Sequence, residues 1–93
     1  MDNNEARAIL TQYLSRYRNR SYADLVGMIG ELDVAETAGP SGAKYQIEVE
    51  VHWDDKAQHN VRVLAGIDDG GWRAWAPLTE SFIMSPDGSL VGE

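Results

Sequence analysis

The chain has 93 residues, of which 43% are hydrophobic and 25% charged, as expected for one small globular domain. Fifteen acidic and eight basic residues give a net charge of −7, which argues against a nucleic-acid partner and favours a basic protein partner. The absence of cysteine excludes disulfides and thiolate chemistry. No apolar run is long enough for a membrane span and the first residues lack an apolar signal region, so we expect a cytoplasmic protein that does not bind membranes.

The first predicted element is an amphipathic helix over residues 2–18. Asp2 is a suitable N-cap, and Glu5 lies three residues later as its capping-box partner. The apolar residues recur at spacings of three and four, which forms a single stripe: Ala6, Ile9, Leu10, Tyr13, Leu14 and Tyr17. This stripe requires an apolar surface of similar length to cover it.

A second, shorter helix is predicted directly after the first. Ser21 resembles an N-cap, and Gly30 resembles the residue that follows a helix end. Its apolar stripe consists of Tyr22, Leu25, Met28 and Ile29. Arg16 and Arg18 close the first helix and Arg20 enters the next turn, where these cations complement the dipole at the helix end.

The strongest strand pattern covers residues 44–53, where apolar and polar residues alternate strictly. One face carries Tyr45, Ile47, Val49, Val51 and Trp53, and the other carries Lys44, Gln46, Glu48, Glu50 and His52. A weaker edge strand over residues 33–38 precedes it, and the turn at 39–42 predicts a hairpin between the two. We therefore expect one dry and one wet sheet face.

Residues 61–67 form the next predicted strand, followed by a tight hairpin at 68–71. This turn length pairs the strand with residues 72–76, which places Leu64 opposite Trp75 and Gly66 opposite Arg73. A last short strand is predicted over 81–84. Beyond the turn at 86–88, Leu90 and Val91 could pair back across it.

Together these elements predict an α+β domain over residues 1–93, with an N-terminal helix pair packed on one face of a four- to five-stranded antiparallel sheet. This order resembles the cystatin-like and NTF2-like class. The Gln-x-Val-x-Gly loop of cystatin inhibitors has its nearest match at 46–50, where the glycine is missing and the segment lies within a strand. The C-terminal runs at 70–74, 85–89 and 91–93 also resemble a set of small uncharacterised bacterial proteins, and this resemblance implies no activity.

The sequence offers one candidate interaction surface on the wet face of the sheet. There Leu64 and Trp75 would lie together, ringed by charged residues, as in an interface anchor. The full set is Glu48, Glu50, His52, Arg62, Leu64, Arg73 and Trp75. The alternative is that the C-terminal segment covers this face with Phe82 and Leu90. The main hypothesis is thus a non-enzymatic interaction module that binds through the sheet face or an edge strand, either to another protein or to a second copy of itself.

A second hypothesis is an NTF2-like ligand-binding or enzyme domain with a pocket between helix and sheet. Its candidate lining residues are Tyr13, Arg16, Tyr17, Tyr45, Trp53 and Trp72, although a domain of this size also needs such aromatic residues for its core. His52, Asp54, Asp55 and His59 lie close in sequence, but their spacing favours a solvated loop over a metal site. We predict no catalytic residues and no cofactor.

Overall fold

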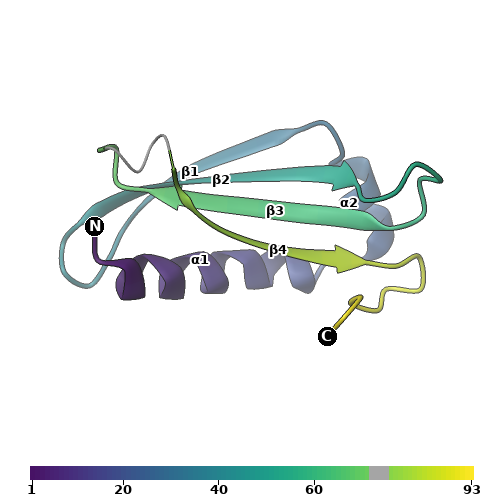
Figure 1. Ribbon diagram of the computed structural model, residues 1–93, viewed down its shortest axis with the longest axis horizontal. Helices are drawn as coiled ribbons and strands as arrows, with labels where there is room; N and C mark the ends of the chain where they lie inside the picture. The colour runs from purple at the N-terminus through teal and green to yellow at the C-terminus, as the bar shows by residue number, and fades with distance from the viewer. Residues whose placement is uncertain (72–75) are drawn as a thin grey trace.

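The computed structural model describes residues 1–71 and 76–93. It contains an α+β fold in which a helix packs on an open, four-stranded antiparallel sheet (Figure 1). The sheet has the strand order β1-β2-β3-β4. The elements are α1 (Asn3–Arg18), α2 (Tyr22–Gly27), β1 (Leu32–Ala38), β2 (Lys44–Trp53), β3 (Val61–Asp68) and β4 (Leu78–Met84).

The helices begin at the predicted N-caps, but the second helix ends earlier than predicted. Asp2 caps α1, because its Oδ1 accepts hydrogen bonds from the N–H groups of Asn4 at 3.0 Å and Glu5 at 3.1 Å. Ser21 caps α2 through the N–H of Asp24. The second helix is shorter than predicted: Met28 bonds to the carbonyl three residues before it, and this tighter turn ends α2.

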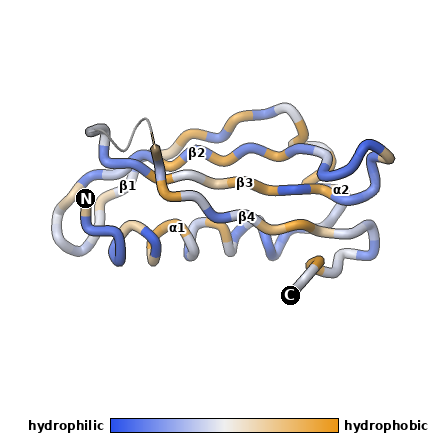
Figure 2. Tube along the Cα trace, viewed as in Figure 1, coloured by the Kyte–Doolittle hydropathy of each residue, from blue (hydrophilic) through white to orange (hydrophobic). Residues whose placement is uncertain are grey.

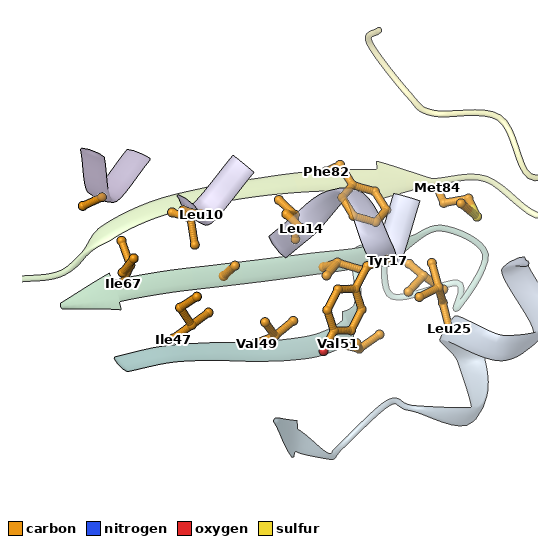
Figure 3. Packing of buried hydrophobic residues seen from close by; sticks show 14 of the residues in the cluster. Leu10, Leu14, Tyr17, Leu25, Ile47, Val49, Val51, Ile67, Phe82 and Met84 are labelled. Atoms are coloured by element: carbon orange, nitrogen blue, oxygen red, sulfur yellow. The ribbon is translucent and has the colours of Figure 1, made fainter. Parts of the chain in front are cut away.

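The apolar stripe of α1 covers the inner face of the sheet, mainly over β3 and β4. Figure 3 shows Leu10, Leu14 and Tyr17 of α1 pointing toward the apolar residues of the strands. The inner residues of the central strands are buried, as the alternation predicts: Ile47, Val49 and Val51 of β2 and Val61, Val63, Ala65 and Ile67 of β3. Along β2 apolar and polar residues alternate (Figure 2), and along β3 buried and partly buried positions alternate. Burial of this face is the main stabilising contribution to the fold.

The predicted hairpin of β1 and β2 is confirmed, with Ala38 opposite Lys44 and Leu32 opposite Glu50. Its loop closes through the Gly39 N–H, which donates to the Ala43 carbonyl at 2.8 Å. Gly42 adopts a φ of +90°, which favours glycine. A Cβ on Gly39 would lie 2.4 Å from Oε1 of Glu5, so the glycine leaves space for that carboxylate.

The predicted pairing of β3 with residues 72–76 is wrong. Both edges of β3 are occupied, one by β2 and the other by β4, so that Leu64 lies opposite Ser81 and Gly66 opposite Thr79. The connection is therefore longer than a tight hairpin. The observed partner strand carries Phe82 and Met84, which are buried on the inner face. Burial of these large side chains outweighs the local preference for a tight turn.

The segment after β4 turns back without forming a fifth strand among the described residues. The turn predicted at 86–88 is present, since the Gly88 N–H donates to the Ser85 carbonyl at 2.9 Å and Gly88 has a φ of +87°. Leu90 forms an isolated bridge with Met84, and the Val91 N–H donates to the Ile83 carbonyl at 2.8 Å. The C-terminal segment thus occupies one end of the outer edge of β4.

Candidate functional site

Strand β1 carries its apolar residues on the opposite face of the sheet from those of its neighbour β2. Antiparallel partners opposite each other point to the same face of a sheet. Leu32 lies opposite Glu50 and Val34 lies opposite Glu48, so both apolar side chains share the outer face with the glutamates. They are 55% and 50% exposed, respectively. Apolar residues at these positions do not contribute to the core.

The inner face of β1 is correspondingly polar, and its charge is satisfied by α1. The Tyr13 hydroxyl donates a hydrogen bond to Oδ2 of Asp33 at 3.0 Å, and the Tyr17 hydroxyl donates to the same oxygen. Burial, together with the Asp33 contact, raises the pKa of both tyrosines above its ordinary value. The helix therefore accommodates a charged residue on the inner face of β1, and the fold stabilises the arrangement in which the apolar residues of this strand face outward.

The exposed apolar residues lie beside an acidic group on β1 and β2. We call this area the outer β1–β2 surface. It consists of Leu32, Val34, Glu36, Glu48 and Glu50. Leu64 of β3 continues it, because this residue lies opposite Glu50 on the next strand.

Much of the negative charge on this surface is not neutralised by nearby cations. Glu50 contacts the His52 ring, with 2.8 Å between Oε2 and Nε2, and Glu48 accepts a hydrogen bond from the Gln46 amide at 3.1 Å. In residues 1–71 and 76–93, neither Glu36 nor Glu48 forms a salt bridge. Arg62 is held by Asp54 at 2.9 Å. The surface therefore combines exposed apolar area with carboxylates available to a basic partner.

The two edges of the sheet differ in how far the chain itself covers them. Among the described residues, β1 pairs along one edge only, with β2. Alternate residues of such a strand direct their N–H and C=O groups away from the sheet. At the other edge, the C-terminal segment bonds to Ile83 and Met84 of β4. The β1 edge is thus the more accessible place for another chain to pair.

The structure brings together five of the seven residues predicted for the interaction surface. Glu48, Glu50, His52, Arg62 and Leu64 all lie on the outer face, with Glu50 opposite Leu64 and His52 opposite Arg62. Arg73 and Trp75, and their predicted proximity to Leu64, lie outside the described residues. The alternative that Phe82 and Leu90 cover this face is wrong, because Phe82 is buried on the inner face and Leu90 packs against the core.

Sequence reasoning missed the β1 members of the surface, namely Leu32, Val34 and Glu36. Counting outward from the four-residue turn predicted at 39–42 would place Val34 opposite Ile47 and Leu32 opposite Val49, on the inner face. The observed register differs by one residue, because Ala38 lies opposite Lys44, and this places Leu32 and Val34 opposite Glu50 and Glu48. The predicted hairpin therefore gave no signal for the outward placement of these residues.

The residues predicted to line a pocket do not converge on one space. Tyr13 and Tyr17 bind Asp33, with the Arg16 guanidinium 5.0 Å from the centre of the Tyr13 ring. Tyr45 instead donates to Oε1 of Glu5 at 2.7 Å, near the hairpin loop. Trp53 is partly buried against the core, and Trp72 lies outside the described residues. The space between α1 and the strands is filled by the buried apolar side chains shown in Figure 3.

Glu5 connects α1 to the β1–β2 hairpin. Its carboxylate accepts hydrogen bonds from the Tyr45 hydroxyl and from both the N–H and the hydroxyl of Ser41. These bonds, led by that of Tyr45, hold the pKa of Glu5 below its ordinary value. The same contact raises the pKa of Tyr45 to about 12. Glu5 is therefore used to attach the hairpin and does not act as the predicted capping-box partner.

The loop after β2 uses its polar residues to fix its own conformation. Oδ1 of Asp55 accepts a hydrogen bond from the His59 N–H at 2.8 Å, while Asp54 holds Arg62. Within the described residues, no three His, Asp or Glu side chains are grouped to hold a metal ion. None of the described helices is both long and apolar enough to cross a membrane.

Comparisons with known proteins do not add a functional assignment. Searches against protein-family models, curated proteins and solved structures found no match for this chain.

Proposed function

We propose that the protein is a non-enzymatic interaction module that binds a basic protein through the outer β1–β2 surface. The observation that carries this proposal is that β1 places its apolar residues on the outer face of the sheet. Leu32 and Val34 expose apolar area beside carboxylates, although a strand in this sheet could place such residues inward. Exposed apolar residues rimmed by charge are typical of binding surfaces.

The charge of the surface supports a basic partner over a second copy of the chain. Glu36, Glu48 and Glu50 would face like charges if two outer β1–β2 surfaces met, and the whole chain carries −7. Like charges placed together disfavour association, whereas lysines or arginines of a partner would pair with these carboxylates.

The fold class also belongs to this proposal. We propose a cystatin-like or NTF2-like class, and the long N-terminal helix packed on one face of an antiparallel sheet supports it. The alternative function, a ligand pocket between helix and sheet, receives no support from the described residues. Leu10, Leu14 and Ile47 are among the fully buried side chains that fill this space.

Site-specific photo-crosslinking in the native cell tests the proposal. A benzophenone side chain is introduced at Val34, and a matched one at Thr11, which is exposed on α1. We expect one discrete adduct with a basic protein from position 34 and none from position 11. Glu48→Lys in the position-34 protein should abolish the adduct, because it reverses a charge on the surface.

Two results would contradict the proposed function. One is the absence of an adduct at position 34 in cells that contain the folded protein. The other is an adduct that forms equally from positions 11 and 34 and survives Glu48→Lys, which would indicate contact without recognition.

A further inference from the structure

We infer that the partner binds as an added β-strand: an extended basic segment pairs with the free edge of β1 and extends the sheet. This inference rests on the proposed function and specifies how the partner is held. Strand addition to an open edge gains affinity from backbone hydrogen bonds and specificity from alternate side chains.

The backbone of β1 is suited to this role. The strand is seven residues long and, among the described residues, has a ladder partner on one edge only. It contains no proline, glycine or lysine, three residues that commonly disrupt or protect an edge strand. Its inward-pointing charged residue, Asp33, accepts hydrogen bonds from the hydroxyls of the two α1 tyrosines.

The side chains of β1 define the segment that would fit. On the outer face, a partner strand would lie directly beside Leu32 and Val34, which favours apolar residues at every second position. Glu36 lies on the same face and lacks a cation among the described residues. Lysines or arginines at the terminal positions of this same face would complement the acidic surroundings, because the intervening positions of the partner strand point to the inner face.

The end of β1 provides a second acidic contact. An open groove of about 440 Å³ lies where the β1–β2 hairpin meets the end of β3. It is bordered by Glu36, Asp68 and Asp69, with Lys44 as the one basic residue among those that line it; Asp69 also contacts the N-terminal ammonium at 3.7 Å. A basic side chain at the end of an added strand would enter this groove, which gives the same charge preference as the outer β1–β2 surface.

Peptide titration followed by NMR tests the inference on the full chain. The probe, called the lysine–valine peptide, is a blocked nonapeptide in which one side presents three central valines flanked by a lysine at each end, and the other side presents threonines. A second peptide carries N-methyl groups on two consecutive central residues, which removes an N–H from each edge while keeping the charge. A third replaces every lysine with glutamate.

We expect the lysine–valine peptide to shift the amide signals of β1 and to slow their hydrogen exchange. Loss of backbone bonds should weaken binding of the N-methylated peptide by at least about tenfold. The glutamate peptide should not bind, and 0.5 M salt should weaken the lysine peptide because screening reduces charge attraction.

A matched pair of variants localises the effect. Val34→Lys places a cation on β1 and should abolish peptide binding, while Val91→Lys makes the same change at another exposed valine and should leave binding unchanged. Far-UV circular dichroism confirms that both variants keep the fold.

The outcomes separate this inference from the proposed function. Equal binding of the N-methylated peptide, with shifts on Glu48 and Glu50 but unchanged exchange at β1, would overturn strand addition and leave the surface proposal intact. No binding of any peptide, while the position-34 crosslink persists, would do the same. A concentration-dependent dimer with a protected β1, seen by light scattering, would show that the occupant is a second copy and would overturn both.

Discussion

Strands β1 and β2 are neighbours in one hairpin, yet their apolar residues lie on opposite faces of the sheet. On β2 the apolar residues face α1 and the glutamates face outward, so Val49 is 1% exposed. On β1 the apolar residues face outward, so Val34 is 50% exposed, and Asp33 faces α1. The pattern of β2 is explained by the burial of apolar area. The pattern of β1 reduces that burial, and the proposal that its outer residues bind a partner rests on this difference.

The largest expected effect is the difference in stability between valine-to-alanine substitutions on the two strands. Val49→Ala removes two buried methyl groups and leaves a cavity, which should lower the free energy of unfolding by about 2–3 kcal/mol. Val34→Ala removes an exposed side chain and should change it by no more than about 0.5 kcal/mol. Urea unfolding measures both values. A loss above 1 kcal/mol for Val34→Ala would show that this residue supports the fold.

The next effect concerns the attachment of β1 to α1. Tyr17→Phe removes one of two hydroxyls that bind the Asp33 carboxylate, and should lower the free energy of unfolding by about 1–2 kcal/mol. The loss should also speed hydrogen exchange in β1 more than in β2, because β2 is held on both edges.

Tyr22→Phe serves as the control for this variant. The Tyr22 hydroxyl donates to the His59 carbonyl at the surface, so its removal should have a smaller effect on stability. Equal losses in the two variants would contradict a specific role for Asp33.

A smaller, pH-dependent effect concerns the attachment of β2 and the hairpin through Glu5. Its lowered pKa means that the folded state binds its proton less readily than the unfolded chain does. The resulting stability is present above the ordinary glutamate pKa, about 4.3, and is lost as pH falls through the folded value. Glu5→Gln should therefore reduce stability at pH 7 and make the decline in stability between pH 5 and 3 flatter. Thermal unfolding at each pH measures this stability.

Unchanged acid sensitivity in Glu5→Gln would show that other carboxylates set this decline.

Alkaline pH provides a complementary check on the same contact. The raised pKa of Tyr45 means that stability present below about pH 10 is lost as pH rises toward about 12. Tyr45→Phe should remove part of this alkaline loss.

Much of the fold follows from sequence because periodicity reports burial. The stripe of α1 and the alternation of 44–53 each identify one buried face, and Asp2 and Ser21 identify the helix starts. The partner of β3 could not be found in this way. A tight turn at 68–71 is locally plausible, whereas the actual pairing depends on Phe82 and Met84 reaching the core. Local turn preference and long-range burial conflict there, and burial decides.

The candidate site was only partly predictable for a similar reason. The β2 and β3 members follow from alternation on the wet face, as Glu48, Glu50 and Leu64 show. The β1 members do not, because a short run with Leu32 and Val34 is naturally read with its apolar side inward. Only the hairpin register, together with the tyrosines that satisfy Asp33, reveals that this side faces outward.

The most direct test of the account is to measure stability and peptide binding together in the double variant Leu32→Ser/Val34→Ser. We predict an unfolding midpoint in urea close to that of the wild type and loss of binding to the lysine–valine peptide. Val91→Ser, at an exposed valine away from β1, should retain both properties. A double variant that unfolds at a much lower urea concentration, or that still binds the peptide with wild-type affinity, would contradict the claim that the outer residues of β1 serve recognition.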